Sequence, residues 1–333
     1  MEYLNLLLYR ICVVSFIFIF AFGCGDSDKP TAKASRSINA DIEIVVGVTL
    51  MTTSNPFFVI LGEAAKKEAA EHDLLIKEVL SGENAENQAN QIRDFITQAV
   101  NAIVIAPNHH FAVGEAIKRA NQAGIPVFTA DTGCSDPSAE VVSNVMTDNY
   151  GGGLLAGEAM IGALGPDGGG KVLILSFDSA QSCLLRVKGF KIKIEEYNQA
   201  NSAAKIEIVA ELPGQAEQDA SKKATEDALN AYEDLAGIFA INDPSALGAV
   251  VAVHNAKKQD KIKIIGFDGQ PIGKQAIRKG DIYADPIQFP KEIGRKVVQQ
   301  IAKYLNGDPV EKEILIPAKL YFQADAANDP EAK

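Results

Sequence analysis

Short apolar runs alternate along the chain with longer stretches whose apolar residues recur every three or four positions. The short runs predict strands at 42–50, 74–80, 102–106, 126–130, 140–146, 171–177, 205–212, 237–241, 262–267, 283–288 and 314–317. The longer stretches predict helices at 56–72, 84–100, 111–123, 150–164, 182–199, 215–231, 244–256, 271–279 and 290–305. This alternation is typical of an α/β fold with parallel sheets covered on both faces, and about ten strands suit two sheets better than one.

The first strand, loop and helix, at residues 44–70, carry side chains suited to a ligand. Asn55 stands at the expected N-cap, and Pro56 at the first helical position, where its missing N–H is not needed. The loop follows the carboxyl end of the strand, where ligands of open α/β sheets bind. There Phe57 and Phe58 offer flat apolar faces to a sugar, and the Asn55 amide can donate to and accept from hydroxyl groups. The alternative for the two rings is a place in the hydrophobic core.

Polar side chains also stand at the ends of most later strands. They are Asp131, Asp178, Asn242, Asp243, Asp268 and Gln288. Helix capping is the alternative for Asp178, Asn242 and Asp243, but capping alone does not account for the whole series. A carboxylate accepts from two hydroxyl groups at once, and such charge-assisted hydrogen bonds are strong. The series therefore predicts a binding site for a neutral ligand rich in hydroxyl groups.

Length and charge narrow the possible functions. At 333 residues the chain exceeds a comfortable single core, and its 47% hydrophobic and 23% charged residues are typical of a soluble globular protein. The net charge is −11, and an acidic chain is a poor partner for nucleic acid or for an anionic membrane surface. We therefore expect at least two domains and no nucleic-acid partner.

The N-terminus has the pattern of a targeting segment. Arg10 precedes an apolar run at 11–22, which is shorter than the roughly 20 residues of a membrane span and suits the core of a signal peptide. The run leads into Cys24 in a context similar to a bacterial lipobox. Residues 1–23 are then removed, Cys24 is lipidated, and residues 24–40 form a flexible polar tether. The alternative is an uncleaved anchor extending back to Leu4; both place the globular part on the periplasmic or cell-surface side of a bacterial membrane.

Two glycine-rich segments imitate nucleotide-binding motifs. Residues 165–171 fit the start of a P-loop, but Val172 stands where a magnesium-binding Ser or Thr is needed. A predicted helix precedes this segment and a strand follows it, which is the reverse of the P-loop order. The glycines at 151–153 resemble a dinucleotide fingerprint but lack its acidic residue. Neither segment predicts a nucleotide site.

Histidine and cysteine give no sign of a metal or catalytic centre. His109 and His110 are adjacent, a spacing that does not converge on one metal ion along a helix. Cys134 and Cys183 are far apart and lack metal-ligand spacing, so free thiols are favoured and a disulfide is the alternative. No Ser, Cys or carboxylate has a catalytic partner that spacing identifies. We expect no cofactor, no bound metal and no catalytic residues.

Six segments carry a family resemblance. They are TTSNPFFVIL (52–61), IPVFTAD (125–131), SAQSCLLRVKGF (179–190), FAINDPSALGA (239–249), IIGFDG (264–269) and DPIQFPKEIG (285–294). Together they resemble the periplasmic sugar-binding proteins of the ribose-binding type, the receptors of ABC importers, over residues 42–323. The resemblance implies two doubly wound parallel-sheet lobes that close over a monosaccharide. It places three hinge crossings near Thr147, Gln288 and Pro317, with a first lobe at 41–147 plus 289–317 and a second at 148–288 plus 318–330.

The resemblance also implies ligand contacts at the matching positions. They are Asn55, Phe57, Phe58 and Asp131 in the first lobe, Arg186, Asn242 and Asp268 in the second, and Gln288 at the hinge. Three positions depart from the family pattern. Thr132 stands where ribose binders place a second arginine, Ala216 replaces an aromatic residue, and Ala106 replaces an asparagine, although Asn108 is close by.

These departures indicate a ligand other than D-ribose. Phe177 occupies a position that is aliphatic and faces the ligand in the ribose binders, so we expect an aromatic clamp of Phe58 and Phe177. Thr132 stands in place of an arginine, and Asp178 follows Phe177 directly. Together they leave the pocket richer in hydrogen-bond acceptors. Several aspartates beside a single arginine repel an acidic sugar, so the expected ligand is a neutral sugar or polyol. The alternative is that Phe177 belongs to the core and ribose still binds.

The resemblance implies a monomer, anchored by its lipid, that delivers a ligand to an ABC permease of the inner membrane. Repressors of the LacI type share the lobe pair but begin with a helix-turn-helix, where this chain has a targeting pattern. A sensory receptor that signals to a membrane kinase or chemoreceptor stays open, because one protein can serve both roles. An enzyme is disfavoured by the missing catalytic constellation.

Overall fold

The computed structural model describes residues 43–165, 168–201 and 203–333. The expected signal peptide, Cys24 and the tether lie outside these residues. Among the helices that are described, none combines the length and the apolar character that a membrane crossing needs. Cys134 and Cys183 are both free thiols, which confirms the expectation from their spacing.

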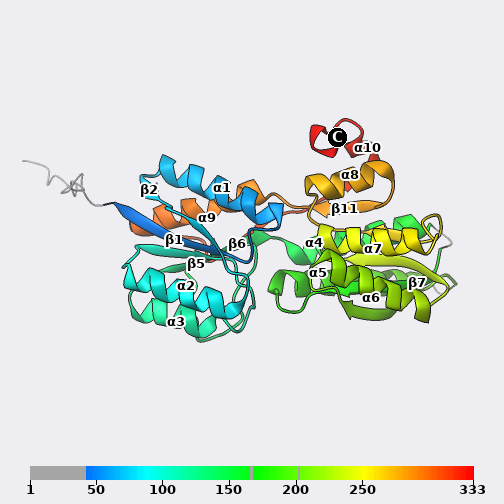
Figure 1. The fold of residues 1–333 in the computed structure, drawn as a ribbon, viewed down its shortest axis with the longest axis horizontal. Helices are drawn as coiled ribbons and strands as arrows, with labels where there is room; N and C mark the ends of the chain where they lie inside the picture. The colour runs from blue at the N-terminus through cyan, green and yellow to red at the C-terminus, as the bar shows by residue number, and fades with distance from the viewer. Residues whose placement is uncertain (1–42, 166–167, 202) are drawn as a thin grey trace, which may run out of the picture. The chain divides into compact units, whose positions relative to one another are not determined.

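The first sheet is entirely parallel, with strand order β12-β6-β5-β4-β1-β2 and β3 beside β1. Its strands are β1 (Ile44–Leu50), β2 (Leu74–Leu75), β3 (Val79–Ser81), β4 (Ala102–Ile105), β5 (Val127–Ala130), β6 (Ser143–Thr147) and β12 (Glu313–Ile316). One face packs against α1 (Pro56–Glu71) and α9 (Pro290–Leu305), and the other against α2 (Ala85–Thr97) and α3 (Gly114–Gln122) (Figure 1). Burial on both faces explains why these strands are continuous apolar runs.

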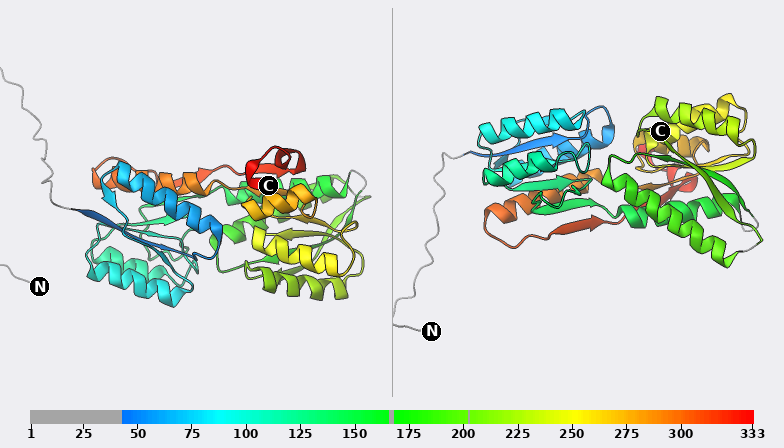
Figure 2. Two further views of the ribbon diagram at one scale, coloured as in Figure 1. Left: turned by 45° about the horizontal axis from the view of Figure 1, so that its top comes forward. Right: turned by 90° about the horizontal axis from the view of Figure 1, so that it is seen from below.

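The second sheet has the order β13-β11-β10-β9-β7-β8. Its strands are β7 (Gly170–Ser176), β8 (Ile206–Pro213), β9 (Leu235–Ala240), β10 (Lys263–Ile265), β11 (Ala284–Ile287) and β13 (Lys319–Phe322). Figure 2 shows helices on both of its faces: α4 (Asn149–Leu164) and α5 (Gln181–Ala200) on one, and α6 (Gln218–Ala231), α7 (Asp243–Asn255) and α8 (Pro271–Lys279) on the other. The chain ends in the short α10 (Gln323–Ala326) and a 3₁₀ turn, Pro330–Ala332.

The chain passes between the two sheets three times. It leaves the first sheet after β6, returns to it as β12, and leaves it again for β13. Pattern alone did not assign the segment at 314–317 to a sheet; it pairs in parallel with β6. Two of the passages are joined directly, because the Thr147 hydroxyl donates to the Gln288 side-chain oxygen at 2.6 Å. The three passages make up the three-strand hinge of the predicted fold class.

Three elements differ from the sequence-based expectations. The strand expected at 74–80 is divided into β2 and β3, because the exposed Lys77 and Glu78 interrupt its burial. The helix expected from 111 begins at Gly114, because residues 110–113 form a turn in which the Gly114 amide donates to the Phe111 carbonyl at 3.0 Å. No strand was expected at the position of β13, which runs antiparallel to β11 at the edge of the second sheet.

Helices α4 and α5 are in very close contact, and glycines make this contact possible. A Cβ atom on Gly189 of α5 would lie 2.2 Å from the carbonyl oxygen of Tyr150 and 2.9 Å from the amide nitrogen of Leu154. A Cβ atom on Gly153 of α4 would lie 2.2 Å from the carbonyl oxygen of Arg186. These neighbours are backbone atoms and cannot swing aside. The glycines therefore fix how near to α4 the segment around Arg186 can lie.

We expect Gly189→Ala to destabilise the protein. Overpacking a tight contact typically costs about 1–3 kcal/mol, and here backbone atoms must move. Gly162→Ala on α4 is the matched control, because the nearest atom to its new Cβ is 3.8 Å away and alanine favours a helix by up to about 1 kcal/mol. Urea unfolding measured by circular dichroism separates the two variants. Equal unfolding midpoints for Gly189→Ala and the wild type would contradict the packing argument.

Candidate functional site

A cavity of about 660 Å³ lies at the carboxyl ends of strands from both sheets. Ten of the twelve residues predicted as ligand contacts line it: Asn55, Phe57, Phe58, Asn108, Asp131, Phe177, Arg186, Asn242, Asp268 and Gln288. They come from loops that follow β1, β4, β5, β7, β9, β10 and β11 and from the first turns of helices. The carboxyl ends of parallel strands thus converge on this cavity, as expected for a doubly wound fold.

Arg186 forms the buried base of the cavity on the side of the second sheet. Its Nη1 donates to Asp268 Oδ1 at 3.2 Å and to the carbonyl oxygen of Ile241 at 2.7 Å. Its Nε donates to Asn149 Oδ1 at 2.8 Å, and the guanidinium carbon lies 4.0 Å from the centre of the Phe267 ring. These contacts come from three separate segments and fix the orientation of the planar guanidinium group. None of these hydrogen bonds involves the other terminal nitrogen, Nη2.

Asp268 lies between this arginine and the hinge. Its Oδ1 also accepts a hydrogen bond from Gln288 Nε2 at 2.6 Å, while the Gln288 oxygen accepts from Thr147. Burial raises the pKa of Asp268. The charge of Arg186 and the hydrogen bonds from Gln288 and Arg186 oppose that rise in pKa. Asp268 has φ 101°, a conformation that is unusual for a residue with a side chain. Backbone strain of this kind is concentrated at functional sites.

Asp131 faces the cavity from the end of β5. It also has a positive φ, 67°, and only 5% of its surface is exposed. Its Oδ1 is buried and has no hydrogen-bond donor among the described residues. Burial raises the pKa of Asp131 to about 7; the charge of Arg186 opposes the rise and the charge of Asp268 adds to it. This oxygen is therefore available to a donor that enters the cavity.

Two phenylalanine rings and two amide side chains, those of Asn55 and Asn108, line the cavity from the side of the first sheet. Asn55 caps α1 as predicted, since its Oδ1 accepts from the Phe57 amide at 3.0 Å. Phe57 and Phe58 are both buried and meet edge to face, with ring centres 5.2 Å apart. Both rings therefore belong to the core and also line the cavity, so the two interpretations of the sequence do not exclude each other. Asn108 donates to the carbonyl oxygen of Met51 at 3.0 Å.

Asn242 likewise combines a cap with a place in the cavity. Its side-chain oxygen accepts from the Ser245 amide at 2.9 Å and so caps α7. Its side-chain nitrogen donates to the carbonyl oxygen of Ala216 at 3.1 Å. That bond secures the loop before α6, where Gln215 and Ala216 both have positive φ.

Two of the predicted contacts lie outside the cavity lining. Thr132 is fully buried, and its hydroxyl accepts a hydrogen bond from the Ser182 amide at 3.2 Å. Thr132 thereby satisfies an amide in the first turn of α5, which has no side-chain cap of its own. Asp178 is exposed in the turn that follows β7.

Several lining residues were missed by sequence reasoning. Cys183 lies one helical turn before Arg186, and that spacing is a signal that could have placed it on the same face of α5. Burial raises the pKa of the Cys183 thiol to about 11, so the thiol is neutral. Glu83 and Gln215 line the cavity from loops, and no local pattern marks them.

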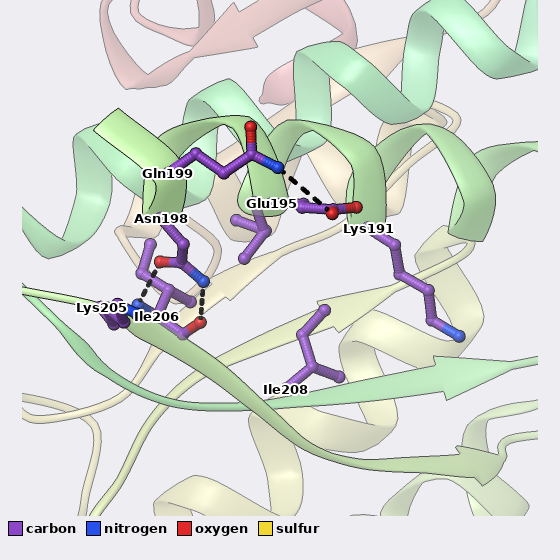
Figure 3. A pocket seen from close by; sticks show the side chains of 8 residues that line it. Lys191, Glu195, Asn198, Gln199, Lys205, Ile206 and Ile208 are labelled. Atoms are coloured by element: carbon purple, nitrogen blue, oxygen red, sulfur yellow. Dashed lines mark hydrogen bonds between the residues drawn. The ribbon is translucent and has the colours of Figure 1, made fainter. Parts of the chain in front are cut away.

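A second hollow, of about 420 Å³, lies between α5 and the edge strand β8 (Figure 3). The polar groups drawn there are largely paired with one another. Asn198 accepts from the Ile206 amide at 2.8 Å and donates to the Ile206 carbonyl at 2.7 Å, and Gln199 donates to Glu195 at 3.3 Å (Figure 3). These bonds tie the helix to the strand, so we assign the candidate site to the larger cavity. In the part of the chain that is described, no cluster of His, Cys, Asp and Glu is arranged to hold a metal ion.

The raised pKa of Asp131 predicts a stabilising substitution in the ligand-free protein. Because this pKa is higher in the folded than in the unfolded state, the contribution of Asp131 to stability is present below about pH 4 and is lost as the pH rises through about 7. Each unit of pKa corresponds to about 1.4 kcal/mol. Asp131→Asn should therefore raise Tm by several degrees at pH 8, and the gain should shrink toward pH 4. Asparagine also tolerates the positive φ.

Thermal unfolding at pH 4, 6 and 8 checks this expectation. Asp178→Asn is the control, since it removes an exposed carboxylate nearby and should change Tm equally little at each pH. A lower Tm for Asp131→Asn at pH 8 would show that the Asp131 carboxylate stabilises the folded protein.

Comparison with known proteins agrees with this geometry. Residues 46–309 match the periplasmic binding protein domain. The ribose import binding protein of Escherichia coli is 33% identical over 86% of this chain and 93% of its own length. A solved ABC transporter solute binding protein from Mycobacterium smegmatis with bound glycerol is 30% identical, with a TM-score of 0.76, and the match covers 86% of this chain and 96% of that one. A second, from Agrobacterium vitis with bound D-fucose, is 29% identical, also with a TM-score of 0.76, and the match covers 86% of this chain and 98% of that one. The chain belongs to the periplasmic binding protein family.

Proposed function

We propose that this protein is the extracytoplasmic substrate-binding protein of an ABC sugar importer and that it binds one neutral monosaccharide or polyol. The observation that carries the proposal is the set of buried polar groups in the cavity. Asp131, Arg186 and Asp268 stand beside the aromatic rings of Phe57 and Phe58. Carboxylate and guanidinium groups suit hydroxyl groups, and the rings suit the C–H faces of a sugar. The protein binds and delivers its ligand without a chemical step.

The charges favour a neutral ligand. The buried lining holds the two carboxyl groups of Asp131 and Asp268 and the single guanidinium group of Arg186, which already bonds to Asp268. A carboxylate on the ligand would meet at least one unbalanced negative charge in a setting with little water. Hydroxyl groups meet no such repulsion and can donate to the buried oxygen of Asp131.

The lining also favours a ligand other than D-ribose. Ala216 supplies no ring, and Phe177 lines the cavity instead, so an aromatic clamp of Phe58 and Phe177 has a different direction from that of the ribose binders. The Thr132 hydroxyl accepts a hydrogen bond from the Ser182 amide, so it does not substitute for the donor that an arginine supplies at this position in the ribose binders. We keep Thr132 and Asp178 as secondary members of the site, next to the ligand rather than in its main contact surface.

Closure about the hinge completes the proposed cycle. We propose a first lobe of residues 41–147 and 289–317 and a second of 148–288 and 318–330, which approach each other when a ligand bridges them. A ligand that contacts both lobes favours their closed arrangement by its differential affinity for that state. The loaded protein is a monomer, held at the membrane by a lipid on Cys24, and it presents the sugar to the permease.

A panel of sugars tests this function directly. We expect a neutral hexose, 6-deoxyhexose or polyol to raise Tm more than D-ribose does, and D-galacturonate to leave it unchanged. Small-angle scattering should show a smaller radius of gyration with that ligand. Phe177→Ala should weaken its binding about tenfold, since losing a ring contact costs roughly 1.4 kcal/mol. Phe111→Ala, at an exposed phenylalanine, is the control. If D-ribose stabilised most and Phe177→Ala had no effect, the ligand assignment would be wrong.

Lipidation of Cys24 has its own test. Cys24→Ser should abolish the lipid-modified form and leave either a precursor or protein released from the membrane, because serine offers no thiol for thioether formation. Cys12→Ser, within the apolar core of the signal peptide, should leave membrane attachment unchanged. Mass spectrometry of the membrane-bound protein gives the answer, and an unmodified Cys24 in that fraction would disprove the anchor.

A further inference from the structure

Behind the candidate site, two aspartates that do not line the cavity are completely buried. Asp243 is the first residue of α7 and Asp285 lies in β11, and neither has any exposed surface. Both flank the loop between β10 and α8 that carries Asp268. Buried carboxyl groups are costly unless they are paired or hydrogen-bonded, so two of them at one place require a reason.

The loop is attached to both sides of this pair. On one side the Gln270 amide donates to Asp243 Oδ2 at 2.6 Å. On the side of β11, the Gly266 amide donates to the Ala284 carbonyl at 3.1 Å and the Asp268 amide to the Pro286 carbonyl at 3.2 Å. Asp268 thus takes its unusual conformation between two anchored ends.

Glycines make room for the pair. A Cβ atom on Gly273 would lie 2.0 Å from Asp243 Oδ1, and one on Gly266 would lie 2.4 Å from Asp285 Oδ1. The backbone therefore closes tightly around both carboxyl groups.

The two carboxyl groups lie close enough together for each to shift the pKa of the other. A carboxylate can only accept, so a bond between two carboxyl groups requires a proton on one of them. Asp243 Oδ1 and both oxygens of Asp285 have no hydrogen-bond partner among the described residues, and a proton held between the two groups supplies the missing donor. Burial and mutual repulsion raise the pKa of Asp243 well above its usual range, and burial raises the pKa of Asp285 to about 7.

We propose that Asp243 and Asp285 hold a shared proton and act as positioning residues that fix the loop of Asp268 against the ligand cavity. The proton stays on Asp243 Oδ1 and bonds to the Asp285 carboxylate, while Asp243 Oδ2 keeps the Gln270 amide. The pair ties α7 and β11 to the loop between them. The consequence for ligand binding rests on the proposed function of the cavity; the shared proton does not.

Other charged or titratable groups around the pair have partners of their own. The charge of Asp268 raises the pKa of both members of the pair, and Asp268 itself is paired with Arg186 of α5. Lys274 of α8 pairs with two carboxylates of the C-terminal segment. Tyr321 stands opposite Asp285 on β13, and its hydroxyl donates to one of the same carboxylates. The pair is thus balanced by a proton rather than by a cation.

Asp285→Asn and Asp285→Ala separate positioning from mere burial. An asparagine amide can donate to Asp243 without a proton, so the loop stays anchored, whereas alanine leaves Asp243 without its partner. In the sugar-free protein, hydrogen exchange at residues 266–270 should stay slow in Asp285→Asn and become at least tenfold faster in Asp285→Ala. Asp260→Asn, at an exposed aspartate, controls for the loss of charge. Equal exchange in all variants would overturn the positioning role.

Urea unfolding of the same sugar-free proteins between pH 5 and 8 tests the proton. The folded wild type holds at least one proton that the unfolded chain releases, so its unfolding equilibrium constant should rise about tenfold per pH unit relative to Asp285→Asn. Parallel pH profiles for the wild type and Asp285→Asn would exclude a shared proton.

Calorimetry at pH 8 with D-allose, D-fucose and myo-inositol then checks binding: Asp285→Asn should keep the wild-type affinity, and Asp285→Ala should bind at least tenfold more weakly. If none of the three binds the wild type, the proposed ligand class fails, while the exchange and unfolding results still decide on the acid pair.

Discussion

The binding cavity depends on the buried ion pair of Arg186 and Asp268. Removing two charges from water is costly, and the cost is recovered only where further hydrogen bonds orient both groups. Here α4, the end of β9 and the hinge each supply one of those bonds. The arginine also stacks on Phe267. The pair therefore links the helix layer, the sheet and the hinge, and the position of each is set relative to one guanidinium plane.

Within the described part of the chain, three other buried acids around this pair form no ion pair with a cation. Asp131 lies across the cavity with a free oxygen, and Asp243 and Asp285 lie behind the loop. Bound protons can balance such groups near neutral pH, because burial raises the pKa values of all three. The region thus keeps many acceptors without a matching number of cations. An environment of this kind suits hydroxyl donors better than anions.

Much of this arrangement could be predicted from the sequence, because it is local. Periodicity gave most strands and helices, and short-range capping rules gave Asn55 and Asn242. Features that depend on contacts between distant segments could not be predicted in the same way. The antiparallel β13 is set by pairing with β11, and the bond between Thr132 and Ser182 joins residues that share no pattern. The family resemblance named the lining but gave no sign that Asp243 and Asp285 are both completely buried behind it.

The bond from the Ser182 amide to the Thr132 hydroxyl joins the two lobes beside the cavity, which Ser182 also lines. The His110 amide makes a similar bond to the Ser179 carbonyl, at 2.9 Å. Three of these four residues lie outside the cavity lining, and Ser182, which belongs to it, makes its bond through the backbone amide. Substitutions in the lining can change ligand preference while leaving the lobe contacts intact. Bonds of this kind let one scaffold acquire new ligands during evolution, or by engineering of a biosensor, without rebuilding the contacts between its lobes.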